Sequence, residues 1–291
     1  MTRTRFAPSP TGPLHLGHAY AALIAAQRGD EMLLRIEDID QSRARPEWEA
    51  AIHADLAWLG VTYPTPAMRQ SERHPAYATA LDALWDRGLL YPCTCTRRDI
   101  EAAASAPQEG APLLGPDGVI YPGTCRGPTN APRPQGVTLR LDMTKAVAQS
   151  GTLAFTETGT GPGDETGMIT MAPDRMITSI GDIVVARKDF GTSYHLSVVL
   201  DDAAQDVTEV TRGADLFEAT PIHVLLQRLL SLPTPRYHHH GLIRDANGKR
   251  LAKRDDARAL RAYRDGGWDG TALAQRLMAS PDTAATIPTT P

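Results

Sequence analysis

The spacing of apolar residues predicts a strand, a helix and a second strand at the start of this chain. The sequence predicts short strands at 3–7 and at the largely apolar 32–36, and an alanine-rich segment at 19–28 lies between them. A strand, a helix and a strand in this order form a βαβ unit, whose two strands are parallel. Because ligands of parallel sheets bind beyond the carboxyl ends of the strands, we expect a site near residues 7–9 and Glu37.

Periodic patterns continue over most of the chain. Helical spacing predicts helices at 46–59, 75–87, 220–230 and 257–264, with a further apolar segment at 273–278. Apolar or alternating runs predict strands at 137–142, 181–187, 207–211 and 237–240. We assign 181–187 to a buried parallel sheet, because its centre is a continuous apolar run. Residues 281–291, rich in Thr, Pro and Ala, are expected to be a disordered tail.

Three polar features are each open to two interpretations. The glycine-rich stretch 159–167 lacks the Gly-Lys-Ser/Thr ending of a phosphate-binding loop, so a hairpin or surface loop is favoured. The triple histidine at 238–240 could bind a metal, but adjacent strand residues point to opposite faces, which favours an ordinary strand. The carboxylates of Glu37, Asp38 and Asp40 could form a metal site or a solvated strand end.

The overall composition is that of a soluble globular protein. Hydrophobic residues make up 42% of the 291 residues, and the mean hydropathy is −0.29. No apolar run approaches the roughly 20 residues of a membrane span, and the N-terminus lacks the apolar core of a signal peptide. We therefore expect a cytoplasmic protein that does not bind membranes. The net charge of −4 gives no general attraction to nucleic acids, so RNA binding would need a local basic surface.

The middle of the chain differs in character from the rest. Residues 101–136 are dominated by Ala, Pro and Gly and hold few large apolar residues, so burial alone cannot stabilise them. Cys93 and Cys95 precede this segment, and Cys125 lies near its end. An odd number of cysteines argues against a disulfide framework and leaves a bound metal or free thiols. Zinc prefers four ligands, often cysteines, and could hold together a loop that lacks a core.

His15, Gly17 and His18 lie near the predicted start of the first helix. A helix start presents unpaired backbone N–H groups and the positive end of the helix dipole, which both favour phosphate. Gly17 lets a ligand approach the backbone closely, and the two histidines can donate to phosphate oxygens. The alternative is an exposed turn with two unrelated histidines.

Two separated motifs together resemble the signatures of class I aminoacyl-tRNA synthetases. His-Leu-Gly-His at 15–18 is similar to the His-Ile-Gly-His signature of that family. Arg-Phe-Ala-Pro-Ser-Pro-Thr-Gly at 5–12 and Arg-Ile-Glu-Asp-Ile-Asp at 35–40 are similar to its glutamate branch. Arg-Leu-Ala-Lys-Arg at 250–254 resembles the Lys-Met-Ser-Lys-Ser loop, although Arg replaces the first Lys and Ala replaces the Ser.

The resemblance implies a site for ATP, accompanied by Mg²⁺, and for L-glutamate. The ATP-binding residues would be Pro8, His15, Gly17, His18, Arg250 and Lys253. The glutamate-binding residues would be Arg5, Phe6, Ala7, Pro8, Ser9, Glu37, Tyr194 and Arg212. The resemblance makes His15, His18 and Lys253 the catalytic residues, as donors beside the phosphates. It directs Glu37 to the amino group of glutamate, and Arg5 and Arg212 to its side-chain carboxylate.

The cysteine pattern is similar to that of glutamyl-queuosine tRNA(Asp) synthetases. This resemblance implies one structural zinc, bound by Cys93, Cys95, Tyr121 and Cys125. It also implies tRNA(Asp) carrying queuosine as a partner, and we expect a monomer. A truncated glutamyl-tRNA synthetase that charges the acceptor end, and a non-catalytic homologue that binds glutamate or nucleotide, are the alternatives.

The fold that the resemblance implies is α/β. We expect a Rossmann-like doubly wound parallel sheet with a zinc-stapled insertion, a short helical C-terminal part and no anticodon-binding domain. The two halves of the catalytic domain would occupy 1–90 and 137–245, and the insertion 91–136. The second signature loop and a short helical segment would occupy 246–280.

Overall fold

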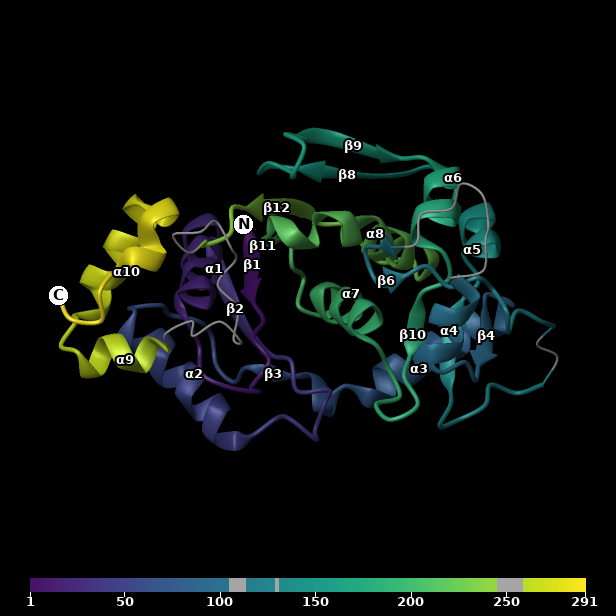
Figure 1. Cartoon of the computed structure of the whole chain (residues 1–291), viewed down its shortest axis with the longest axis horizontal. Coiled ribbons are helices and arrows are strands. Elements are labelled where there is room, and N and C mark those ends of the chain that lie inside the picture. The colour runs from purple at the N-terminus through teal and green to yellow at the C-terminus, as the bar shows by residue number, and fades with distance from the viewer. Residues whose placement is uncertain (105–113, 129–130, 245–258) are drawn as a thin grey trace.

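The computed structural model describes residues 1–104, 114–128, 131–244 and 259–291 (Figure 1). Strand β1 (Arg3–Phe6) pairs in parallel with β2 (Glu31–Ile36), and helix α1 (Leu16–Arg28) connects them. The predicted βαβ unit is therefore confirmed. The helix begins three residues earlier than expected, because His15 caps it.

The first half of the catalytic fold is completed by strand β3 and two helices. These elements are α2 (Pro46–Trp58), β3 (Met68–Arg69), a short 3₁₀ turn (Gln70–Glu72) and α3 (His74–Asp86). Strand β3 pairs in parallel with β2 on the side opposite β1. Both helices had been predicted from the spacing of their apolar residues.

The second half supplies two more parallel strands. Strands β11 (Glu209–Gly213) and β12 (Arg236–His240) pair in parallel, and α7 (Tyr194–Ala204) and α8 (Thr220–Leu229) pack around them. The triple histidine thus lies on an ordinary strand. The two halves join beside β1, where the backbone N–H of Thr208 donates to the carbonyl of Arg3 at 2.9 Å. The strand order β3-β2-β1-β11-β12 is that of a doubly wound sheet, with its switch point between β1 and β11.

A hairpin extends this sheet on the β12 side. Strand β8 (Leu153–Glu157) pairs in parallel with β12 and in antiparallel fashion with β9 (Gly167–Met171), and the pair lies along the upper edge of Figure 1. The glycine-rich stretch joins the two strands. The expectation of a hairpin, and not a phosphate-binding loop, is confirmed.

A small separate sheet overturns one prediction. Strand β10 (Val184–Ala186) pairs with β7 (Thr138–Leu141) in antiparallel fashion, and β7 pairs in the same way with β4 (Leu90–Cys93). Our assignment of 181–187 to the parallel sheet was therefore wrong. A continuous apolar run shows that a strand is buried on both faces, but it does not show the direction of its neighbours.

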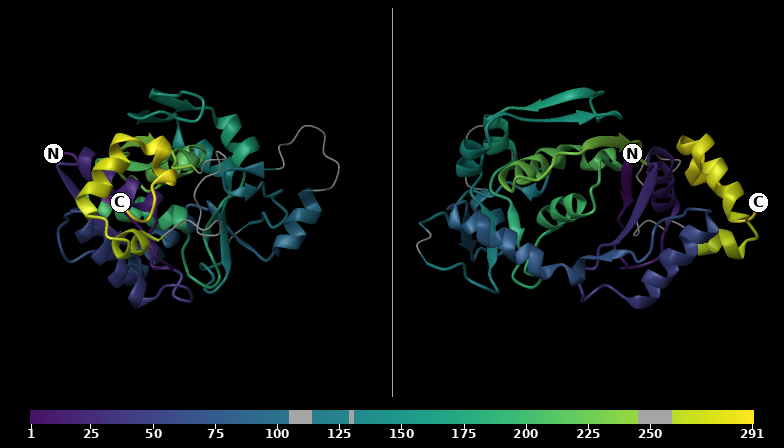
Figure 2. Two further views of the ribbon diagram at one scale, coloured as in Figure 1. Left: turned by 60° about the vertical axis from the view of Figure 1, so that its left-hand side comes forward. Right: turned by 180° about the vertical axis from the view of Figure 1, so that it is seen from behind.

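The remaining elements lie around this small sheet and its insertion. They are α4 (Arg97–Ala104), the hairpin of β5 (Leu114–Gly115) and β6 (Gly118–Val119), α5 (Met143–Ser150), α6 (Pro173–Arg175), a π-helical turn (Met176–Ile180) and a 3₁₀ segment (Ala214–Ala219). Figure 2 shows the insertion at one end of the elongated molecule and the C-terminal helices at the other.

The C-terminal helices α9 (Leu260–Asp265) and α10 (Gly270–Ala279) share a hydrophobic core with α1 and α2. A 3₁₀ segment (Pro281–Thr286) follows, and Ala284 and Ile287 are buried in the same core. The expectation of a disordered tail is wrong for this part of the chain, because two apolar residues anchor it. No helix in the described part of the chain is long and apolar enough to cross a membrane.

Candidate active site

The first two predicted site residues form the cap of α1. The Nδ1 atom of His15 accepts a hydrogen bond from the backbone N–H of Gly17 at 3.1 Å, and Nδ1 of His18 accepts one from the backbone N–H of His15 at 3.1 Å. The two imidazole centroids are 3.8 Å apart. Because both Nδ1 atoms are acceptors, each neutral ring carries its proton on Nε2. The pair therefore offers N–H donors at a helix start, where anions are favoured.

Packing against the capping histidine favours glycine at position 17. A Cβ atom at this position would lie 3.0 Å from Cε1 and 3.1 Å from Nδ1 of the His15 ring. A side chain would press on the ring that caps the helix. The sequence had indicated only that Gly17 would leave room for a ligand.

A cavity of about 350 Å³ opens at the switch point between β1 and β11. Its lining contains every residue predicted to bind glutamate: Arg5, Phe6, Ala7, Pro8, Ser9, Glu37, Tyr194 and Arg212. It also contains residues that the sequence did not indicate for this pocket: Thr11, His18, Ala21, Thr211, Gly213 and Leu216. His18 lines this cavity as well as capping α1, so the predicted glutamate and ATP regions meet there.

A buried ion network supports one wall of this pocket. Asp202 accepts from Nε of Arg5 at 3.1 Å and from Nη1 of Arg35 at 2.6 Å. Arg5 also donates through Nη1 to the carbonyl of Thr211 at 2.9 Å, which ties β1 to β11. Arg35 is fully buried, and Arg5 and Asp202 are 6% and 5% exposed. Arg5 is thus held in one orientation from both halves of the fold.

The neighbouring acid, Asp201, has a structural role. It accepts hydrogen bonds from Gln70 at 2.9 Å and from Tyr77 at 2.8 Å, and it forms an ion pair with Arg73 at 3.2 Å. Sequence reasoning missed both Asp201 and Asp202. The available signal was a pair of acidic residues within an apolar segment, which a protein buries only when cations or donors meet them.

Glu37 follows the end of β2 and lines the same pocket, next to the ion network. Its Oε1 atom is 3.5 Å from Nη2 of Arg35, and its side chain is 13% exposed. Burial raises the pKa of Glu37 to about 7, although Arg35 and Arg5 act in the opposite direction. A carboxylate that is costly to ionise in the empty pocket is stabilised when an ammonium group binds beside it.

The other two carboxylates of this string have structural partners. Asp38 accepts from the backbone N–H of Ser71 at 2.8 Å, and Asp40 accepts from that of Ser42 at 3.2 Å. Neither belongs to a group of metal-binding side chains within the described residues. The described residues therefore do not support a metal site at Glu37, Asp38 and Asp40.

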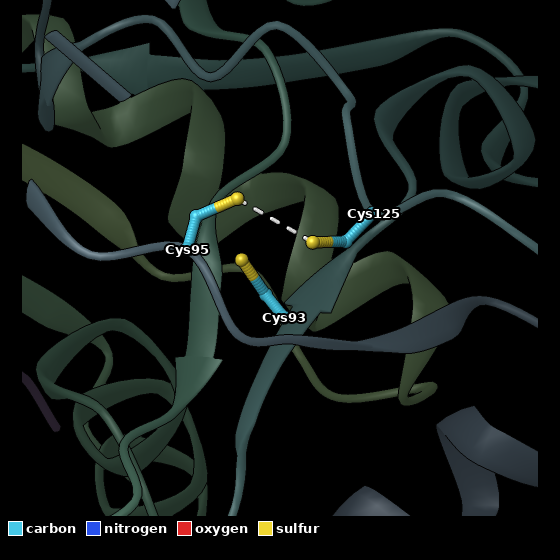
Figure 3. Close-up of side chains that lie close together, drawn as sticks. All are labelled: Cys93, Cys95 and Cys125. Atoms are coloured by element: carbon cyan, nitrogen blue, oxygen red, sulfur yellow. Dashed lines mark hydrogen bonds between the residues drawn. The ribbon is translucent and has the colours of Figure 1, made fainter. Parts of the chain in front are cut away.

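The cysteines come together in the insertion, as predicted (Figure 3). The Sγ atoms of Cys93, Cys95 and Cys125 all lie within 4.8 Å of one another, and those of Cys95 and Cys125 are 3.4 Å apart. The hydroxyl of Tyr121 is 3.3 Å from Sγ of Cys95 and accepts from the backbone N–H of Cys125 at 2.9 Å.

This donor set fits a zinc ion. Zinc–thiolate bonds of about 2.3 Å in a tetrahedron place sulfur atoms about 3.8 Å apart. The hydrogen bond with Tyr121 lowers the pKa of the Cys125 thiol to about 6, which favours a thiolate. The guanidinium of Arg140 lies 3.9 Å from the Tyr121 ring centroid and donates to Sγ of Cys93 at 3.4 Å. The four side chains could hold zinc in a structural role.

Two predicted ATP-binding residues, Arg250 and Lys253, lie outside the described residues. The chain resumes at Ala259, which pairs with His15, and the backbone N–H of Leu260 donates to the carbonyl of Leu14 at 2.8 Å. Ala259, which follows the second signature motif in the sequence, therefore lies against the first signature motif at His15.

Comparisons with known proteins agree with this arrangement. The chain matches the family described as tRNA synthetases class I (E and Q), catalytic domain, over residues 1–113 and 164–280. A Glutamyl-Q tRNA(Asp) synthetase from Rhodobacter capsulatus is 62% identical over 269 residues, which are 90% of this chain and 94% of the relative. A protein with the same name from Nitratidesulfovibrio vulgaris is 41% identical over 92% of this chain and 82% of the relative.

Solved structures show the same fold. A glutamate tRNA ligase from Elizabethkingia meningosepticum, in complex with its amino acid, has a TM-score of 0.66 at 26% identity. The match covers 88% of this chain and 52% of the ligase, so this chain spans about half the length of that enzyme. Mycobacterium tuberculosis methionyl-tRNA synthetase, 11% identical with a TM-score of 0.56, shares the fold alone. The chain therefore belongs to the class I tRNA synthetases of the E and Q type and, within that family of ligases, to the glutamyl-Q tRNA(Asp) synthetases.

Proposed function

We propose that this enzyme activates L-glutamate with ATP and transfers the glutamyl group to the queuosine base at the wobble position of tRNA(Asp). The observation that carries the proposal is the pocket at the switch point, which gathers Arg5, Glu37, Tyr194 and Arg212 beside His18. The names of the similar proteins from Rhodobacter capsulatus and Nitratidesulfovibrio vulgaris support tRNA(Asp) as the acceptor.

In the proposed complex, the charged groups of L-glutamate meet opposite charges. The Arg212 guanidinium, with Arg5 beside it, binds the side-chain carboxylate, a geometry that an amide cannot satisfy equally well. Glu37 binds the ammonium group, and Tyr194 closes the pocket. The α-carboxylate is then left for reaction with ATP.

The start of α1 would bind the phosphates of ATP. His15 and His18 donate through Nε2, while Pro8 and the backbone at Gly17 leave room for the nucleotide. Mg²⁺ bound with ATP would neutralise part of the phosphate charge. Lys253 would supply a further cation; the described residue Ala259, which follows the second signature motif in the sequence, pairs with His15.

The proposed reaction has two steps. In the first, an oxygen of the α-carboxylate of glutamate attacks the α-phosphorus of ATP, and pyrophosphate leaves. In the second, a hydroxyl of the queuosine base attacks the carbonyl carbon of glutamyl-adenylate, and AMP leaves. No residue of the enzyme forms a covalent bond, so catalysis depends on alignment and on donors placed where charge develops.

Pyrophosphate exchange tests the first step. We expect glutamate-dependent exchange between pyrophosphate and ATP without tRNA, and we expect Lys253→Ala to abolish it while the melting temperature is unchanged. Lys188→Ala, which changes an exposed lysine outside the site, is the control and should retain exchange. Undiminished exchange in Lys253→Ala would refute the role of Lys253, and no exchange in the wild type would favour a non-catalytic binding protein.

An acceptor assay tests the second step. Purified tRNA(Asp) with and without queuosine would be incubated with labelled glutamate, ATP and enzyme. We expect labelling of the queuosine-containing tRNA alone. The similarity to a glutamate tRNA ligase keeps the ribose of the acceptor end as the competing site, and equal labelling of both tRNAs would favour it.

A further inference from the structure

Arg212 is held from behind by two buried histidines. Its Nη1 atom lies 2.9 Å from Nδ1 of His223 on α8, and its Nε atom lies 3.1 Å from Nε2 of His239 on β12. Its Nη2 atom donates to the hydroxyl of Thr220 at 2.8 Å. Arg212 is 6% exposed, and each histidine is 2% exposed. Three separate groups therefore fix the plane of the guanidinium.

The hydrogen-bond pattern determines which nitrogen of each ring carries the proton. A guanidinium has only donors, so Nδ1 of His223 and Nε2 of His239 must accept. Each ring then donates through its other nitrogen: His239 to Oε2 of Glu157 at 2.5 Å, and His223 to Nδ1 of His195 at 3.0 Å. Both rings that face Arg212 are therefore neutral.

The neutral state is also the one that burial favours. Burial lowers the pKa of His223 well below its usual value, and the charge of Arg212 lowers it further. Burial and Arg212 likewise lower the pKa of His239, although the hydrogen bond to Glu157 acts in the opposite direction. At neutral pH neither ring adds a positive charge beside the guanidinium.

Neutral acceptors have an advantage that a carboxylate would lack. A buried carboxylate would orient an arginine firmly, but it would also compensate the charge, as Asp202 does for Arg5 and Arg35. No carboxylate of the described residues forms an ion pair with Arg212, whose neighbours there are imidazoles and a hydroxyl. Its positive charge remains available to an anion that enters the pocket.

We propose that His223 and His239 are positioning residues that determine amino-acid specificity, because they orient Arg212 without neutralising its charge. His223 also contacts Tyr194, a second residue that lines the pocket: the two rings lie edge-to-face at a centroid distance of 5.7 Å. The chain of contacts continues from His195 to Asp117 of the insertion, at 3.2 Å. This inference rests on the proposed binding of L-glutamate in the pocket and extends it to residues behind the pocket.

Three substitutions of His223 separate the components of this proposal. In His223→Asn, Oδ1 can take the place of Nδ1 as an acceptor, so the KM for glutamate in the exchange assay should change less than about threefold. His223→Leu removes the acceptor and should raise that KM by about tenfold or more, because hydrogen bonds to charged groups are among the stronger ones. His223→Asp supplies a compensating charge and should lower the preference for glutamate over glutamine by about tenfold or more. In all three, the KM for ATP should be unchanged.

A second pair of substitutions applies the same test from β12. In His239→Gln, the amide oxygen can replace Nε2 as acceptor, and the effect should be mild, whereas His239→Leu should resemble His223→Leu. His238→Gln is the matched control: His238 lies next to His239 on the strand, is half-buried, and faces the hydroxyl of Thr158 at 3.3 Å. It should leave the KM for glutamate unchanged.

The outcomes distinguish this proposal from a merely structural role and from failure of the proposed function. Melting temperatures identify variants that do not fold. A loss of kcat with unchanged KM in folded His223→Leu, or equal effects of Asn and Leu, would overturn the positioning role. Glutamate binding by calorimetry provides a readout independent of ATP. If the wild type binds glutamate but shows no exchange, the proposed reaction fails while the positioning role stands; if it does not bind glutamate, both fail.

Discussion

The proposed glutamate pocket and the cysteine cluster are stabilised in opposite ways. The pocket lies at the junction of two parallel strands, and its supporting charges on Arg5, Arg35 and Asp202 are almost completely buried and paired with one another. The cysteine cluster lies in the insertion, where only Cys93 and Tyr121 of the four donor residues are buried. The pocket is therefore supported by buried residues of the main fold, whereas only a small buried cluster, Tyr91, Cys93 and Tyr121, supports the cysteines.

This difference indicates which site needs a ligand in order to keep its shape. Asp202 pairs with both Arg5 and Arg35 from within the fold itself, so this wall of the pocket is held in place by the protein's own residues. Three sulfur atoms within 4.8 Å of one another are held in place most effectively by a shared metal ion. We therefore expect changes in the pocket to affect the whole fold and changes in the cysteine cluster to remain local.

The largest effect is expected from Asp202→Asn. Among the described residues, Asp202 is the one acid that forms ion pairs with both Arg5 and Arg35, so this change leaves two buried cations close together. We expect the free energy of unfolding in urea to fall by about 3–5 kcal/mol. Asp206→Asn is the matched control, because the side chain of Asp206 is 86% exposed and should contribute less than about 1 kcal/mol. Equal losses of unfolding free energy in the two variants would contradict the view that the buried ion pairs stabilise the pocket.

A smaller effect is expected from the titration of Glu37. Burial raises its pKa to about 7, so the group becomes protonated and neutral as the pH falls below that value. Because the ammonium group of glutamate needs the carboxylate form, the dissociation constant should rise by up to about tenfold for each pH unit below 7. Calorimetry at pH values about one unit apart, from about 5.5 to about 8, measures the dissociation constant of glutamate. Glu37→Gln should bind weakly at every pH, and a wild-type profile that is flat in this range would contradict the assignment.

The smallest effect on the pocket is expected from Cys125→Ser. This variant should lose zinc, as measured by metal analysis, and should exchange amide hydrogens faster in the segment 114–128 of the insertion, which contains Tyr121 and Cys125. Its dissociation constant for L-glutamate should remain within about twofold of the wild-type value, because no cysteine lines the pocket and Asp117, through which the insertion contacts His195, is 40% exposed. A loss of glutamate affinity of about tenfold or more in folded Cys125→Ser would show that the two regions are coupled.

The sequence was sufficient for the parts of the site that lie in local motifs. The cap formed by His15 and His18, the end of β2 at Glu37 and the cysteine spacing are each contained within short segments, so pattern and resemblance identified them. The supporting residues could not be found in this way. Asp202 reaches Arg5 across 197 positions of the chain, and no local pattern records such a contact.

The wrong predictions have equally specific causes. The strand at 184–186 was placed in the wrong sheet, because an apolar run carries no information on strand direction. The segment after residue 280 was expected to be disordered from its composition, but Ala284 and Ile287 anchor it in the core beside α1. The triple histidine was correctly taken as a strand, yet the role of His239 behind Arg212 became evident only in three dimensions.

The most direct test of the account is a calorimetric comparison of L-glutamate and L-glutamine binding to the wild-type enzyme without tRNA. Because Arg212 and Glu37 both line the pocket and no carboxylate of the described residues forms an ion pair with Arg212, we predict that glutamate binds at one site per chain. Glutamine should bind at least about a hundredfold more weakly, since it cannot pair with the charge of Arg212. Equal affinities for the two amino acids, or no binding of glutamate, would contradict the account.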